Sequence, residues 1–138
     1  MIELTRIIPE VEVLLALEPE ELAAKILFLI RDRIARGDAT SGMVNPGNFS
    51  NELWAYGHQE HNYPKNRDVE VELAIAEAVA WLRAQGLILA ASGQSGNSGW
   101  CVLNRRARRF ENESQFSDYS AARMLPRDLL HRRIRTEA

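Results

Sequence analysis

Cysteine is almost absent from the sequence, in which Cys101 is the only one. The chain can therefore form no internal disulfide and no cysteine-based zinc site. A long hydrophobic run is also missing, because the most apolar stretch, residues 22–34, is interrupted by four charged residues. That stretch is too short and too charged to span a bilayer, and the acidic residues 1–12 do not resemble a secretory signal. We expect a cytoplasmic protein without membrane contact.

Composition and length point to one folded domain. The 138 residues are 46% hydrophobic and 26% charged, which is typical of globular chains and excludes wholly disordered or collagen-like ones. A chain of this size can bury a core without metal or disulfide support. We expect no cofactor.

Acidic and basic residues are distributed unevenly along the chain. Residues 1–99 hold 8 basic and 14 acidic side chains, whereas residues 100–138 hold 9 basic and 5 acidic ones. Such asymmetry is typical of a face that meets an anionic partner. It is equally compatible with solvated charge, or with acidic and basic parts that pack on each other or on a second copy of the chain.

Apolar spacing predicts two long helices. The first runs from Pro19 to Arg36, with proline and two glutamates in its first turn and Gly37 after its end. The second runs from Asp68, as its cap, to Gly86, and is rich in alanine. Short helices are expected over residues 10–17, 48–56 and 127–134, and loops over residues 37–47 and 58–67.

A hairpin follows the second long helix. Residues 87–91 and 100–103 are short apolar strands, and residues 92–99 between them are all Gly, Ser, Gln or Asn, which is typical of a hairpin tip. Asn104 can cap a further helix in which Leu103, Ala107 and Phe110 share one face. Residues 111–120 are polar and have no expected element.

The order of helix, short helix, long helix, hairpin and helix resembles a winged-helix module. The segment Leu82-x-x-x-Gly86-Leu87-Ile88 is similar to the end of a winged-helix recognition helix, and residues 100–107 resemble the segment after the wing. The resemblance implies a mainly α (α+β) fold, with a three-helix core and a β-hairpin wing. It places a winged-helix-like domain at residues 1–110, with its core at 19–110, followed by a polar segment and a short C-terminal helix or tail at 111–138.

Residues 14–22, 51–54 and 123–127 are also similar to the N-terminal part of some uncharacterised bacterial proteins. In those proteins the chain continues into a helical C-terminal domain. The family has no settled activity to transfer to residues of this chain.

Winged helices typically read DNA with the recognition helix, but this one carries Asp68, Glu70, Glu72 and Glu77. Carboxylates repel phosphates, and affinity for duplex DNA depends on cations. The candidate nucleic-acid contacts therefore lie around the helix and the wing: Lys65, Arg67, Asn97, Ser98, Arg105, Arg106, Arg108 and Arg109. The arginines either clamp neighbouring phosphates or form a solvated face.

The preferred hypothesis is a non-catalytic module for protein association or dimerisation in a bacterial cytosolic protein, and atypical DNA binding is the alternative. Interfaces are enriched in tryptophan and tyrosine, so Tyr56 and Trp100 are the candidate contact residues, whereas Trp54 and Trp81 are expected in the core.

The sequence gives little indication of catalysis or metal binding. His58 and His61 are three residues apart, but they lie in an expected loop. Gly93, Gly96 and Gly99 lack the Lys-Ser/Thr of a phosphate-binding loop. Cys101 lies in an apolar strand, where a thiol is expected to be inert. We expect neither a metal site nor an enzyme.

Overall fold

The structure, a computed structural model, describes residues 1–37, 42–54 and 62–122. Within these residues the fold is mainly helical, with one two-stranded antiparallel sheet, as the sequence predicts. The elements in chain order are α1 (Leu4–Ile7), α2 (Val11–Ala16), α3 (Pro19–Ala35), η1 (Pro46–Asn48), α4 (Phe49–Trp54), η3 (Lys65–Arg67), α5 (Asp68–Ala84), β1 (Ile88–Ala90), α6 (Gly93–Asn97), β2 (Cys101–Leu103) and α7 (Arg105–Arg109). Residues 113–122 are also helical.

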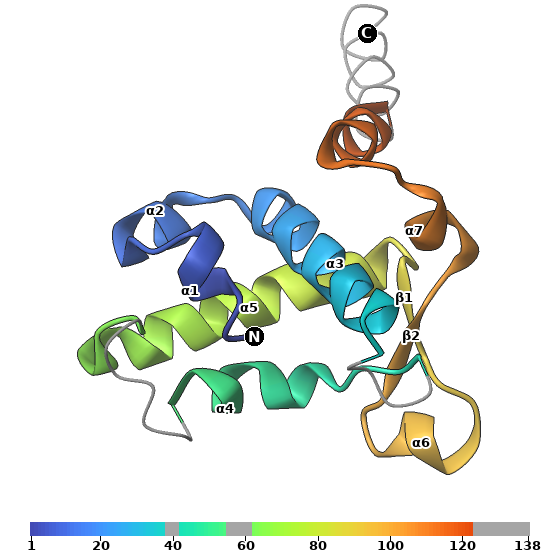
Figure 1. The fold of residues 1–138 in the computed structure, drawn as a ribbon, viewed down its shortest axis with the longest axis horizontal. Helices are drawn as coiled ribbons and strands as arrows, with labels where there is room; N and C mark the ends of the chain where they lie inside the picture. The colour runs from blue at the N-terminus through green and yellow to red at the C-terminus, as the bar shows by residue number, and fades with distance from the viewer. Residues whose placement is uncertain (38–41, 55–61, 123–138) are drawn as a thin grey trace, which may run out of the picture.

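The two long helices form the centre of the fold, and α3 packs across α5 (Figure 1). Glu18 and Glu21 form a capping box before α3, in which the Glu18 amide donates to Glu21 Oε1 at 2.9 Å. The buried side chains of α5 recur at helical spacing and belong to the same core as those of α3. Both long helices are therefore confirmed. Asp68, expected as a cap, is instead the first residue of α5, because η3 supplies the preceding turn.

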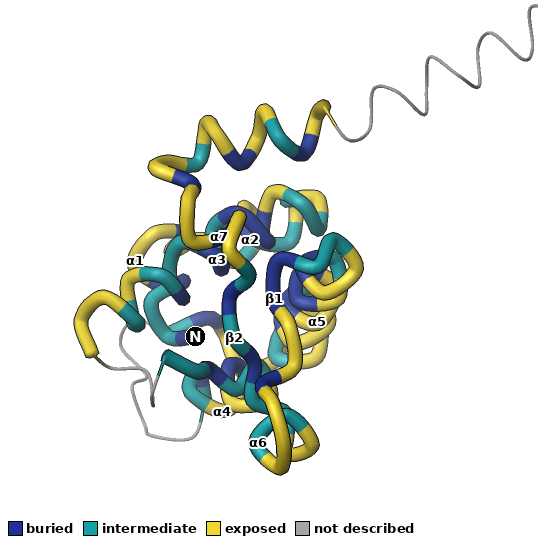
Figure 2. Tube along the Cα trace, turned by 90° about the vertical axis from the view of Figure 1, so that its right-hand side faces the viewer, coloured by how far each residue is buried: buried dark blue, intermediate teal, exposed yellow. Residues whose placement is uncertain are grey.

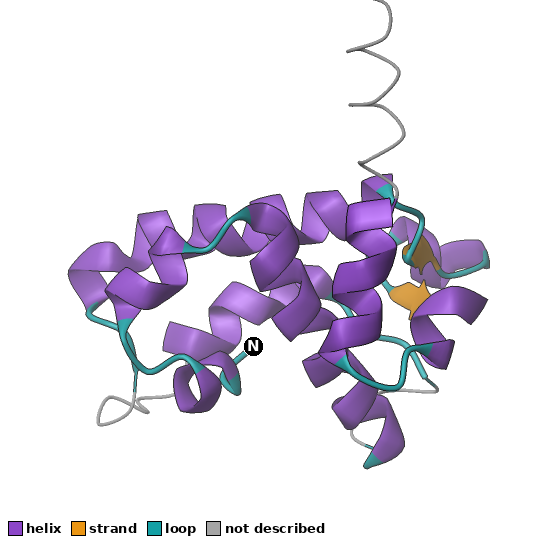
Figure 3. Ribbon diagram, turned by 90° about the horizontal axis from the view of Figure 1, so that it is seen from above, coloured by secondary structure: helices purple, strands orange, loops and turns teal. Residues whose placement is uncertain are grey.

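The β-hairpin lies at one end of the helical fold (Figure 3). Strand β1 pairs with β2 in the register Ile88↔Leu103, Leu89↔Val102 and Ala90↔Cys101, so both expected strands are present. Val44 adds a single bridge, with its amide donating to the Cys101 carbonyl at 3.0 Å. The described part of the loop expected over residues 37–47 contains no strand or α-helix, but it includes this bridge and the start of η1. Residues 38–41 of that loop lie outside the described residues.

The segment between the strands is not the simple loop that its composition predicts, because α6 forms one short helical turn there. Gly96 explains how: a Cβ at this position would lie 1.9 Å from the Ala91 carbonyl oxygen, so only glycine allows the turn to fold back on β1. Long-range packing thus overrides the low helix propensity of a Gly- and Ser-rich segment.

Residues 113–122 form a helix where the sequence predicted no element. Phe116 is 1% exposed and contacts the rings of Trp81 and Phe110, each at 5.6 Å between centroids. Buried positions recur along this helix among exposed ones (Figure 2). Two aromatic side chains, Phe116 and Tyr119, anchor an otherwise polar sequence, which is too weak a pattern to recognise. The expected helix at 127–134 lies outside the described residues.

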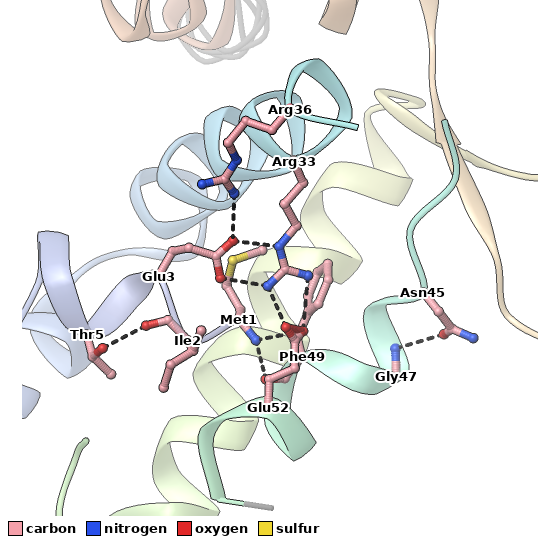
Figure 4. A network of polar contacts seen from close by, with 10 residues as sticks. All are labelled: Met1, Ile2, Glu3, Thr5, Arg33, Arg36, Asn45, Gly47, Phe49 and Glu52. Carbon is pink, nitrogen blue, oxygen red and sulfur yellow. Dashed lines mark hydrogen bonds and ion pairs between the residues drawn. The ribbon is translucent and has the colours of Figure 1, made fainter. Parts of the chain in front are cut away.

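A partly buried ion-pair network joins the start of the chain to α3 and α4 (Figure 4). Arg33 Nε lies 2.6 Å from Glu3 Oε2, and Arg33 Nη2 lies 2.5 Å from Glu52 Oε2. The Met1 amine donates to the Phe49 carbonyl at 2.5 Å, and burial lowers its pKa from 8.0 to about 6. Burial raises the pKa of Glu3, but the hydrogen bonds and charge of Arg33, a backbone hydrogen bond and the charge of the Met1 amine together lower it below its usual value. The network explains why α1, a helix too short to predict, is held in place.

Replacing Arg33 with Met should lower the free energy of unfolding by about 2 kcal/mol at neutral pH, because Glu3 and Glu52 lose a partner in a half-buried site. The pKa of Glu3 is lower in the folded chain than its usual 4.5. The contribution of the pair is therefore full above that value, and it is lost as the pH falls through the lower folded value. Urea unfolding of Arg33→Met at neutral and acidic pH should show a smaller acid-side loss than the original chain.

The matched control is Arg36→Met, because Arg36 is a second arginine near Glu3 whose side chain is 52% exposed and lies 3.7 Å from Glu3 Oε2. Its cost should stay below about 0.5 kcal/mol. Equal costs for the two variants would contradict the assigned role of Arg33.

Candidate functional site

One face of α5 lies away from the core and carries apolar residues. The inner positions of the helix are buried, but Val69 is 72% exposed and Leu73 is 59% exposed. Ala76 and Ala80, also exposed, continue the same row at helical spacing. These four residues are called here the outer face of α5.

Carboxylates flank the outer face. Glu70, Glu72 and Glu77 are all exposed on neighbouring positions of the helix. Arg67 donates hydrogen bonds to Glu70 and lowers its pKa. Glu72 and Glu77 have no ion pair with any residue in the described ranges. Around Val69 and Leu73 the outer face is therefore an apolar row with a negative border, and Arg83 lies beyond its Ala80 end.

A groove runs beside the outer face, between α5 and the η1–α4 segment. It encloses about 620 Å³. Its walls are apolar or small, apart from Glu72 and Arg83, and comprise Pro46, Gly47, Ser50, Ile75, Ala76, Val79 and Ala80. A partner that covers the outer face could also reach into this groove.

A second surface of opposite charge lies at α7. Asn104 Oδ1 accepts a hydrogen bond from the Ala107 amide at 2.7 Å and begins the helix, as the sequence predicts. Ala107 is buried, so its four arginine neighbours project from the helix. Together with β1 they line a groove of about 650 Å³, called here the arginine groove, which is formed by Leu89, Leu103, Asn104, Arg105, Arg106, Arg108 and Arg109.

The four arginines differ in how they are held. Arg108 Nε donates to the Leu103 carbonyl at 3.1 Å, and Arg106 stacks over the Tyr119 ring at 4.9 Å. Arg105 and Arg109 lie one helical turn apart, and neither pairs with a carboxylate of the described residues. The groove therefore presents unneutralised positive charge beside Leu89, which is 48% exposed.

The structure does not bring all the predicted nucleic-acid contacts together. Lys65 pairs with Asp68 at 3.4 Å, and Arg67 is held by Glu70 and Glu12. Lys65 and Arg67 precede α5, whereas α7 lies beyond the opposite end of that helix (Figure 1). The helix between the two groups has 17 residues and is therefore about 25 Å long.

The wing residues add no charge to either group. Asn97 is exposed in α6, and the Ser98 carbonyl accepts a hydrogen bond from Asn45 Nδ2 at 3.2 Å. The candidate list therefore divides into three places, of which only the α7 arginines form a built groove.

Of the two candidate contact residues, Tyr56 lies outside the described residues. The histidine pair, His58 and His61, also lies outside them. Trp100 is half-buried beside β2. Trp54 and Trp81 pack against the core, as expected. Cys101 is 3% exposed, with its sulfur 3.6 Å from Arg83 Nη2 and from the Gly99 carbonyl oxygen.

Sequence reasoning found the arginines but not the outer face of α5. One signal in the sequence could have indicated this face: Val69 and Leu73 lie on a different side of the helix from the apolar row of Val71, Ile75 and Leu82. Within the part of the chain that the structure describes, no three potential ligands cluster as a metal site would require. No helix there is long and apolar enough to cross a membrane. Comparisons with protein-family models, curated proteins and solved structures found no match.

Proposed function

We propose that this chain is a non-catalytic, winged-helix-like module that mediates protein association through the outer face of α5. The order α3, α4, α5, β1, β2 and α7 supports the winged-helix resemblance, and the Val44 bridge adds a third extended segment to the hairpin. The proposed compartment is the cytoplasm, where a free thiol such as that of Cys101 stays reduced.

The observation that carries the proposal is the exposure of Val69 and Leu73 between carboxylates. In a DNA-reading winged helix, this helix would face phosphates, and contact there requires cations. Here α5 offers apolar side chains bordered by Glu70, Glu72 and Glu77 instead. Exposed apolar rows with polar borders are typical of protein interaction surfaces.

The size of the outer face suits a reversible contact. Covering a large apolar side chain contributes about 1.5–3 kcal/mol, and the outer face has two of them. Ala76 and Ala80 leave space for the backbone of a partner to approach closely. Because association also costs several kcal/mol of lost freedom, we expect affinity to depend on the whole row and on its charged border.

Replacing Leu73 with Glu should abolish association without disturbing the core. Sedimentation equilibrium or light scattering across about 10 μM to 1 mM, where a 1 mM dissociation constant corresponds to about −4.1 kcal/mol, should show a mass above the monomer for the original chain. Leu73→Glu should remain monomeric. The control is Ile7→Glu, since Ile7 is 49% exposed on α1, and it should associate normally. A monomeric original chain at every concentration would refute the proposal.

Nucleic-acid binding is the second candidate, and the arginine groove favours it. Each phosphate neutralised on duplex DNA contributes about 0.9 to the slope of log affinity against log salt. We expect a titration with duplex DNA at about 50 and 200 mM salt to show no submicromolar binding. Submicromolar binding with a steep salt slope that flattens in Arg105→Ala/Arg109→Ala would instead support nucleic-acid binding as the function.

A further inference from the structure

We propose that the outer face of α5 in one copy of the chain docks into the arginine groove of a second copy. The inference rests on the proposed function and names its partner. It assigns the outer face of α5 and the arginine groove to one contact.

The two surfaces match in kind and are opposite in charge. The outer face has Val69 and Leu73 at its centre and unpaired carboxylates on Glu72 and Glu77 at its border. The arginine groove combines half-exposed Leu89 with guanidinium groups, two of which, on Arg105 and Arg109, pair with no carboxylate of the described residues. Apolar centres would be covered while guanidinium groups meet carboxylates, a pairing that arginine geometry favours.

Within one copy, no described residue forms an ion pair with Glu72, Glu77, Arg105 or Arg109. Among the described residues, one ion pair links residues 1–99 to residues 100–122, between Lys25 Nζ and Glu113 Oε2 at 2.8 Å, and it does not involve α7. Among the described residues, the guanidinium groups of Arg105 and Arg109 can therefore meet the carboxylates of Glu72 and Glu77 of another copy. A second copy fits this requirement without any partner of different composition.

Such a contact is heterologous, because two different surfaces meet. If the rotation between copies closes, the copies form a ring, and if it does not, copies add in a chain; when two copies exchange both contacts, the result is a twofold dimer with an isologous interface. Both cases predict association that weakens with salt, since the charged borders are exposed to solvent.

Mixing two variants tests the contact directly. Arg105→Glu/Arg109→Glu damages only the groove, and Leu73→Glu damages only the outer face. Each should be monomeric alone in sedimentation velocity. An equimolar mixture should form a 1:1 complex and nothing larger, because one intact face and one intact groove remain. The matched control mixes Leu73→Glu with Val69→Glu, which leaves no intact face, and should stay monomeric.

Other outcomes separate this inference from the proposed function. If the original chain associates and Leu73→Glu does not, but the groove variant associates normally, the groove is not the partner surface and the inference fails alone. Failure of the equimolar mixture to form a complex overturns it as well. If the original chain stays monomeric, the proposed function fails and takes the inference with it.

Circular dichroism and thermal unfolding show whether the groove variant folds. If the charge reversal prevents folding, Arg105→Gln/Arg109→Gln replaces it in every mixture. The neutral variant should associate at least tenfold more weakly than the original chain, and unchanged affinity would overturn the inference.

Discussion

The packing of α5 on α3 is the constraint on which the other features depend. Val71, Ile75 and Leu82 are buried on the side of α5 that faces the core. Because an α-helix repeats every 3.6 residues, fixing these positions inward leaves Val69 and Leu73 outward. The outer face is thus a consequence of the core, and no movement of single side chains would hide it.

Contacts with the hairpin and the core fix the position of α7, and with it the arginine groove. The Asn104 amide donates to the Leu87 carbonyl at 2.9 Å, and its side chain caps α7. Ala107 and Phe110 are buried in the core, which fixes the orientation of this short helix. The arginines therefore project from a helix of fixed position, and the helix keeps Arg105 and Arg109 one turn apart. A surface with its charges already placed costs less entropy on binding than a flexible one.

Local signals account for the elements that the sequence predicted. Pro19 and the following glutamates mark the start of α3, Asn104 marks the cap of α7, and apolar runs on both sides of a Gly-rich segment mark the hairpin. The missed features depend on contacts between distant residues. These features are α1, the Val44 bridge, α6 and the helix at 113–122, held respectively by Arg33, by Cys101, by Gly96 against Ala91, and by Phe116 against Trp81.

The candidate site divides in the same way. The α7 arginines could be predicted because Arg105–Arg109 is a dense run of one charge. The outer face of α5 could not be identified from periodicity alone, since the helix is apolar on several sides and the packing of α3 decides which side is inside. Likewise, the neutralisation of Lys65 and Arg67 depends on Asp68, Glu70 and Glu12, and Glu12 is distant in the sequence.

The central claim is that Val69 and Leu73 are covered when the protein associates. Methyl nuclear magnetic resonance spectra recorded at increasing protein concentration test it most directly. The methyl signals of Val69, Leu73 and Leu89 should shift together, while those of Ile7 and Val13, which are also exposed, on α1 and α2, should not move. Unchanged Val69 and Leu73 signals at concentrations where the mass exceeds that of the monomer would contradict the claim.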